Sequence, residues 1–243
     1  MNYADIKYPD IQDGEGIRVG LYVSGCHFHC VECHNKESWD FNYGKEFTDE
    51  TIDYIMNILK ESYVNGLSLL GGEPLELVNQ KGLLPLVKRV KEELPEKDIW
   101  CWTGYDFEKD VLGKMYKTNE VSKELLQYID IIVDGQFEIE NKIKDLKFRG
   151  SINQRKIDVQ KSLQNGKLVK LKFGDESRYE DKKPKIMYFG EFKKSNNNLT
   201  KENENNKIPV NFEVIKSFEN ASEQPNTIVE QEIKETIAAK NVD

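Results

Sequence analysis

The chain has 243 residues, with 35 Lys and Arg against 43 Asp and Glu, and it carries a formal net charge of −8. This acidity argues against nonspecific binding to nucleic-acid phosphates or anionic membranes, which needs clustered cations. No apolar run reaches the length of a membrane span, and the first residues lack the basic and apolar regions of a secretory signal. We therefore expect a cytoplasmic protein, in a reducing compartment where cysteines serve metal or redox chemistry.

Strand and helix patterns alternate along the first 173 residues. β-branched and aromatic runs that end at glycine or aspartate predict the strands, and apolar residues at helical spacing predict the helices. In chain order the predicted elements are a strand at 17–24, a helix at 48–63, a strand at 66–71, a helix at 79–93, a strand at 98–103, a helix at 121–128, and strands at 129–133 and 167–173. Such alternation predicts an α/β fold with a mainly parallel sheet and crossover helices.

The composition changes after residue 173. Residues 195–206 are of low complexity and rich in asparagine, and the segment after 173 has no Cys, His or Trp. Two apolar islands, 186–189 and 210–215, are candidates for the strands of a β-hairpin. We therefore expect a core at 1–173 and a polar, partly flexible C-terminal extension at 174–243 without a catalytic role.

Three of the four cysteines and all three histidines lie within nine residues, on the loop that follows the first predicted strand. Cys26, Cys30 and Cys33 form the pattern C-x₃-C-x₂-C, and three thiolates at this spacing can hold three corners of a 4Fe–4S cluster. The fourth iron would then be open to a ligand. The alternative is a zinc site, in which one of the histidines completes the ligand set. These histidines are His27, His29 and His34.

The fourth cysteine, Cys101, falls in a predicted buried strand, where a thiol behaves as a small hydrophobic group. Four unusual segments follow the carboxyl ends of predicted strands, at 25–35, 71–74, 103–106 and 134–137. Open α/β sheets and barrels place their active sites along that edge. We therefore expect the four segments to form one composite site.

The cysteine pattern, followed one strand later by Gly71-Gly72-Glu73-Pro74, resembles the radical S-adenosylmethionine (SAM) superfamily. Two glycines let a backbone approach a ligand closely, and a carboxylate can accept a hydrogen bond from an ammonium group. The resemblance implies a partial (β/α) barrel whose three cysteines bind a 4Fe–4S cluster. It places the methionyl part of SAM on Gly71, Gly72 and Glu73, and the adenosine beside Glu32, Cys33 and His34.

Within the superfamily, residues 1–165 resemble the activating proteins of anaerobic ribonucleoside-triphosphate reductase. The stretches that carry this likeness are 23–26, 34–35 with Trp39, 102–105, 130–137 and 149–155 followed by 157–158. Glu32 departs from the pattern, because this family often has glycine there. The resemblance implies that one electron from a flavodoxin-like donor cleaves SAM, and that the 5′-deoxyadenosyl radical generates a glycyl radical on the reductase.

Two rival functions remain open from the sequence. One is a radical SAM enzyme that acts on a small molecule, as the deazaguanine-forming synthases do, and the other is a zinc-stabilised adaptor without catalysis. Arg149, Asn153 and Arg155 either shape the partner or SAM site or simply hold a helix entry loop. Asp134 is either a ligand contact or a turn residue. The tryptophans Trp39, Trp100 and Trp102 are interpreted as packing residues.

Overall fold

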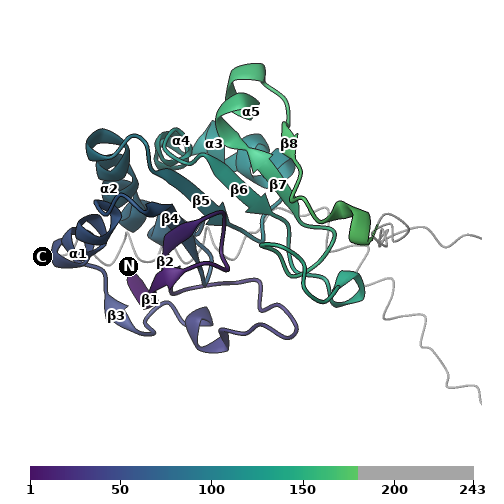
Figure 1. The fold of residues 1–243 in the computed structure, drawn as a ribbon, viewed down its shortest axis with the longest axis horizontal. Helices are drawn as coiled ribbons and strands as arrows, with labels where there is room; N and C mark the ends of the chain where they lie inside the picture. The colour runs from purple at the N-terminus through teal and green to yellow at the C-terminus, as the bar shows by residue number, and fades with distance from the viewer. Residues whose placement is uncertain (180–243) are drawn as a thin grey trace, which may run out of the picture. The chain divides into compact units, whose positions relative to one another are not determined.

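An eight-stranded mixed sheet forms the centre of the fold, as the computed structural model shows for residues 1–179 (Figure 1). Its strands are β1 (Asn2–Asp10), β2 (Ile17–Val23), β3 (Lys45–Glu46), β4 (Val64–Gly71), β5 (Asp98–Trp102), β6 (Ile131–Asp134), β7 (Arg155–Asp158) and β8 (Lys170–Leu171). They lie in the order β3-β1-β2-β4-β5-β6-β7-β8. The expected hairpin from 186–189 and 210–215 lies outside the described residues.

The middle of the sheet is parallel and both edges are antiparallel. β2, β4, β5 and β6 pair in parallel, while β1 runs antiparallel to β2, and β7 runs antiparallel to β6. The helices are α1 (Asp49–Leu59), α2 (Leu77–Glu93), α3 (Tyr116–Thr118), α4 (Glu120–Leu126) and α5 (Val159–Asn165), with a π-helical segment at Phe107–Met115. The predicted α/β fold with a mainly parallel central sheet is confirmed.

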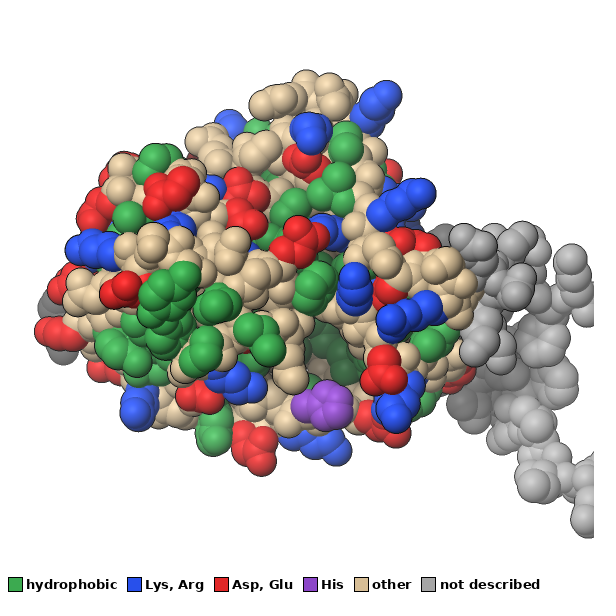
Figure 2. Space-filling view, viewed as in Figure 1, with side chains coloured by type: hydrophobic (Ala, Val, Ile, Leu, Met, Phe, Trp, Pro, Cys, Tyr) green, Lys and Arg blue, Asp and Glu red, His purple; other side chains and the backbone are tan. Residues whose placement is uncertain are grey.

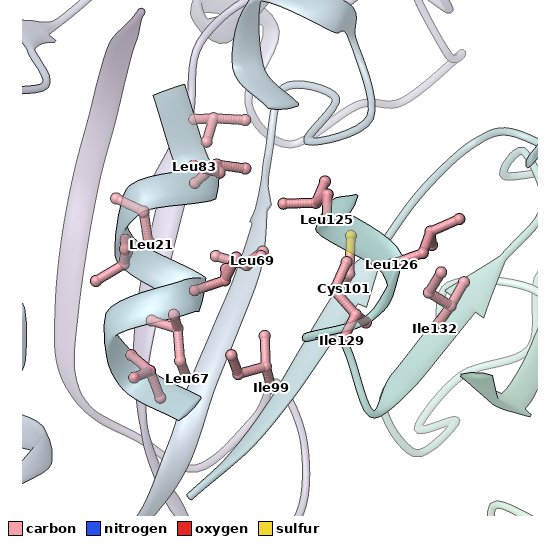
Figure 3. Packing of buried hydrophobic residues seen from close by; sticks show 14 of the residues in the cluster. Leu21, Leu67, Leu69, Leu83, Ile99, Cys101, Leu125, Leu126, Ile129 and Ile132 are labelled. Carbon is pink, nitrogen blue, oxygen red and sulfur yellow. The ribbon is translucent and has the colours of Figure 1, made fainter. Parts of the chain in front are cut away.

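The apolar core lies between one face of the sheet and the helices. Alternate residues of successive strands point into it because side chains alternate between the two faces of a strand. These residues include Leu21, Leu67, Leu69, Ile99, Cys101 and Ile132, which Figure 3 shows beside Leu83 of α2 and Leu125 and Leu126 of α4. Each such aliphatic side chain that leaves water stabilises the fold by about 1.5–3 kcal/mol.

The opposite face of the same strands is polar and aromatic. Arg18 of β2 is fully buried there, and its guanidinium donates to Ser68 Oγ (2.7 Å) and Asp98 Oδ1 (2.6 Å). Two cations contact the ring of Trp100, with Arg18 at 5.3 Å and Lys156 at 4.5 Å from its centre. The face opposite the apolar core is therefore held by buried hydrogen bonds and by contacts of cations with an aromatic ring.

Most predicted elements are present, with some corrections. The strand predicted at 167–173 is largely wrong, since only Lys170–Leu171 pairs, with β7. β1, β7 and α5 were not predicted, because β1, which lies between β3 and β2, has mostly polar residues and β7 has one fully buried apolar residue, Ile157. No helix within residues 1–179 is both long and apolar enough to cross a membrane.

Candidate functional site

One cavity of about 530 Å³ is lined by residues from all four of the unusual segments that follow the predicted strands. Cys26, Gly72, Gly104 and Gly135, one from each segment, contribute to its lining. Figure 2 shows a hollow in the lower half of the molecule with a histidine at its edge, and every histidine of the chain lies on the cysteine loop. The expectation of one composite site at the carboxyl ends of the parallel strands is confirmed.

The cysteine loop leaves the end of β2 and is held by backbone hydrogen bonds to the segment that follows it. Gly25 N–H donates to the carbonyl of Ser38 (2.7 Å), and Cys26 N–H donates to the carbonyl of Trp39 (3.2 Å). Cys33 N–H donates to the carbonyl of Cys30 (3.2 Å), which closes a turn between these two cysteines. As a result, all three thiols of the pattern face one cavity.

The donor set fits a cluster with three cysteine ligands. Burial raises the pKa of the Cys26 thiol to about 11, and the nearby backbone N–H groups of Phe28 and His29 act in the opposite direction. Hydrogen bonds to ligand sulfurs are one means by which proteins tune iron–sulfur clusters. Cys101, the remaining cysteine of the chain, is fully buried in the apolar core.

Within residues 1–179, no three His, Cys, Asp or Glu side chains are gathered closely enough to hold a single metal ion. The cysteines of a cubane cluster bond to different irons, so they need not converge on one point. Ligation by Cys26, Cys30 and Cys33 therefore stays a prediction, supported by their shared cavity.

The three histidines of the loop have different surroundings. His27 Nδ1 is 2.8 Å from Glu76 Oε1, and the ring of His29 stacks on that of Trp39 with centres 4.5 Å apart. His34 lines the cavity. Only His34 of the three is thus in the wall of the site.

The two glycines of the Gly71-Gly72-Glu73 turn are required by the chain itself. Gly71 has a φ of +104°, a region that L side chains rarely adopt, and a Cβ on Gly72 would lie 2.6 Å from the carbonyl oxygen of Gly25. Glu73 N–H donates to that same carbonyl (2.8 Å). The turn after β4 is therefore fastened directly to the start of the cysteine loop.

Glu73 is 1% exposed, lines the cavity and accepts three hydrogen bonds from the protein on its carboxylate. Its Oε1 accepts from Leu75 N–H (2.9 Å) and the Thr103 hydroxyl (2.8 Å), and its Oε2 accepts from Gly104 N–H (2.8 Å). Burial raises the pKa of Glu73 to about 7, although these hydrogen bonds act in the opposite direction. The site thus contains a carboxylate that a cationic ligand would stabilise.

Glu32, Cys33 and His34, the predicted neighbours of adenosine, all line the cavity. Glu32 has a φ of +60°, a conformation that costs a residue with a Cβ about 1–2 kcal/mol, which accounts for the glycine often found there. Its carboxylate accepts from Lys142 Nζ (2.6 Å) across to the segment after β6, and this contact lowers the pKa of Glu32. Contact with adenosine stays a prediction.

The stretch 149–155 mainly holds loops together. Arg155 donates to the buried Asp134 and also pairs with Asp106 (3.2 Å), and Arg149 pairs with the buried Asp175 (2.9 Å). Asn153 donates to the carbonyl of Gln136 (2.8 Å). None of these three side chains of the stretch lines the cavity. The geometry favours the loop-holding interpretation.

Asp134 is completely buried, and its Oδ2 accepts from the backbone N–H of Phe107 (2.8 Å) in addition to Arg155. Among the tryptophans, Trp100 is buried as expected. Trp39 and Trp102 have a surface in the cavity as well as packing contacts.

One wall of the cavity was not predicted. It is lined by Lys7 of β1, by Gln12 and Asp13 of the loop after β1, and by Tyr22 of β2. There the hydroxyl of Tyr22 donates to Asp13 Oδ2 (2.7 Å), and burial raises the pKa of Asp13 to about 6. The glycine-rich run at 12–16 was the available signal, since a tight polar loop just before a strand often borders a site.

The fold and the site define an α/β protein with a cavity lined by three cysteines at the carboxyl ends of its parallel strands. A family model described as a 4Fe-4S single cluster domain matches residues 12–157. The anaerobic ribonucleoside-triphosphate reductase-activating protein of Pasteurella multocida is 43% identical over 156 residues, which cover 63% of this chain and 95% of the relative. The proteins of the same name from Enterobacteria phage T4 and Escherichia coli K12 are 42% and 40% identical, over 64% and 63% of this chain and 92% and 96% of their own lengths.

The chain belongs to the family of anaerobic ribonucleoside-triphosphate reductase-activating proteins. The resemblance stated from its motifs is therefore confirmed. The match to a 4Fe-4S domain supports an iron–sulfur cofactor over the zinc alternative.

Proposed function

We propose that this chain activates an anaerobic ribonucleoside-triphosphate reductase by reductive cleavage of SAM at a 4Fe–4S cluster. The observation that carries the proposal is one cavity that contains both the three cysteines of the loop and the Gly71-Gly72-Glu73 turn. A cluster and a ligand that must bind its open iron need such a shared space. The reductase is proposed as the partner because it appears in the names of the relatives at 40–43% identity.

A bound, reduced cluster would supply one electron to the sulfonium of SAM, with methionine as the leaving group, and the resulting 5′-deoxyadenosyl radical would take a hydrogen atom from a glycine of the reductase. Cys26, Cys30 and Cys33 would hold the cluster. With Cys101 buried in the core, the chain offers no fourth cysteine, so one iron is left for SAM. Reduced flavodoxin-like protein is the proposed electron donor.

The residues around the cluster would hold SAM. Gly71, Gly72 and Glu73 bind its methionyl end, where the buried carboxylate accepts from the ammonium group. The adenosine lies beside the segment 32–34. The sequential order of the parallel strands β2, β4, β5 and β6 supports the proposed partial (β/α) barrel of the radical SAM type.

This function is assigned to residues 1–173, with 174–243 as an extension. The first residues of the extension contact the core, since Asp175 pairs with Arg149 and accepts from Lys147 N–H (2.7 Å).

The test is electron paramagnetic resonance of the full chain, reconstituted with iron and sulfide without oxygen, reduced, and measured with and without SAM. We expect a reduced-cluster signal whose g-values shift when SAM is added, because SAM binds the open iron. Addition of the purified reductase should then produce a glycyl-radical signal.

Stoichiometric zinc without a cluster signal would overturn the proposal. Normal SAM cleavage without radical transfer to the reductase, but with turnover of a free pterin, would instead assign the chain to a small-molecule reaction.

A further inference from the structure

The hydroxyl of Thr103 has its hydrogen-bonding direction fixed by its neighbours. Tyr105 N–H donates to Thr103 Oγ1 (3.1 Å), so a lone pair of that oxygen faces the backbone of the turn after β5. The hydroxyl proton is then free to point at Glu73 Oε1, which lies 2.8 Å away. Thr103 is 4% exposed, so water does not compete well for either bond.

The donors around Glu73 leave one acceptor position open. A carboxylate has about four lone-pair sites, two on each oxygen. Leu75 N–H and the Thr103 hydroxyl occupy Oε1, while Gly104 N–H is the single protein donor on Oε2. The remaining acceptor is therefore on Oε2, in a side chain that lines the cavity.

The three donors also come from two different strand ends. Leu75 follows β4 on the same turn as Glu73, whereas Thr103 and Gly104 follow β5. Thr103 and Gly104 together thus fix the rotation of the carboxylate relative to the neighbouring strand, and the Thr103 hydroxyl is the one side-chain donor among the three.

We infer that Thr103 is a positioning residue, which orients Glu73 so that Oε2 accepts a hydrogen bond from a primary ammonium group in the cavity. The inference rests on the proposed function, since it takes the ammonium to be that of SAM. On this inference, Thr103 makes the site selective for ligands that carry both an ammonium and a carboxylate group, over ligands whose corresponding end is uncharged or only anionic.

The test compares two ligands that differ only in the amino group. These are S-adenosylhomocysteine and its desamino analogue, in which hydrogen replaces that group. Their dissociation constants are measured by titration calorimetry on the reconstituted full chain, for wild type, Thr103→Val and Thr103→Ser. Valine keeps the shape of threonine without the hydroxyl, and serine keeps the hydroxyl.

We expect Thr103→Val to weaken S-adenosylhomocysteine roughly tenfold while the desamino analogue changes less than twofold, because a charge-assisted hydrogen bond is misdirected. Thr103→Ser should retain the wild-type ratio of the two dissociation constants. Equal weakening of both ligands, or an unchanged ratio in Thr103→Val, would overturn the inference. The ratio compares two ligands in one preparation, so partial loss of folded protein does not alter it.

If Thr103→Val does not fold, Thr103→Ala is the second variant that lacks the hydroxyl. The same ratio of dissociation constants then tests the inference. A wild-type protein that shows no preference for the amino ligand would instead count against the proposed binding of SAM itself. Failure of the inference and failure of the proposed function are thus distinguishable.

Discussion

At the scale of single residues, Glu73 makes the stability of the fold depend on pH. Burial raises its pKa from 4.5 to about 7, so between these values the folded chain holds a proton that the unfolded chain has lost. The free energy of unfolding must therefore fall as the pH rises through this window. We expect Glu73 to lower the stability of the cluster-free protein by up to about 3 kcal/mol between pH 4.5 and pH 8.

Urea denaturation at several pH values, on wild type and Glu73→Gln, measures this contribution. The glutamine variant should lose the part of the pH dependence due to Glu73 and keep the part due to Asp13, whose pKa is raised in the same direction. Glu120→Gln, at a side chain that is 89% exposed, is the matched control and should follow the wild type. Parallel curves for wild type and Glu73→Gln would contradict the prediction.

The cysteines allow a second comparison between residues of one kind. Cys30→Ala should abolish cluster binding and leave the fold intact, because its side chain lies on the loop at the cavity. Cys101→Ala should keep the full iron content and lose about 1 kcal/mol of stability, because it opens a small space in the core. Iron analysis and visible absorption after reconstitution measure the cluster content of both variants. A Cys30→Ala protein with normal iron content would refute the assignment of Cys30 as a ligand.

At the scale of elements, Arg155 joins β7 to the loops that follow β5 and β6. Its guanidinium bonds to Asp134, which is completely buried, and to Asp106. Removal of the arginine would leave a buried carboxylate without its cation. We expect Arg155→Ala to lower the free energy of unfolding by about 3–5 kcal/mol, measured by urea denaturation.

Arg89 is the control for this prediction. It also bonds to two carboxylates, those of Asp53 and Glu93, but all three side chains are at least 36% exposed. Such exposed pairs contribute at most about 1 kcal/mol, so Arg89→Ala should have a small effect. Similar losses in both variants would mean that burial of Asp134 does not govern the stability of this loop cluster.

The elements also show what the sequence can and cannot predict. β2, β4 and β5 were predictable because their buried residues form apolar runs closed by glycine or a polar turn. The meeting of four loops followed from the parallel order, since parallel strands end at the same edge. The glycine-rich run at 12–16 marks a loop, but its place in the wall of the cavity was not predictable, because Ser68 Oγ donates to the carbonyl of Asp13 (2.5 Å) and only the folded sheet brings those two residues together.

The motif residues illustrate the same limit. Gly72 was interpreted as room for a ligand, whereas in the structure a Cβ at this position would lie only 2.6 Å from the carbonyl oxygen of Gly25. The role of Thr103 was also hidden, because a threonine after a strand has many uses and only the distance to Glu73 distinguishes them. Patterns thus identified the loops of the site, and tertiary contacts determine how each residue acts.

At the scale of the whole molecule, the core extends through the contacts of Asp175. Arg149 is buried between Asp175 and the ring of Phe173, whose centre is 3.8 Å from the guanidinium carbon. A chain that ends at residue 173 would leave this arginine without its carboxylate. We expect it to be less stable than a chain that ends at 179 by about 3 kcal/mol, as measured by urea denaturation. Equal stability would place the end of the core at residue 173.

The arrangement of the tryptophans gives the chain an optical reporter of its own site. Trp39 and Trp102 line the cavity, and Trp100 stacks on Trp102 with ring centres 5.7 Å apart, so all three indoles of the protein are within or next to that space. Iron–sulfur clusters absorb light in the near-ultraviolet range where indoles emit. The fluorescence of the unlabelled protein should therefore fall as the cavity fills, and cluster assembly can be followed in real time without a dye.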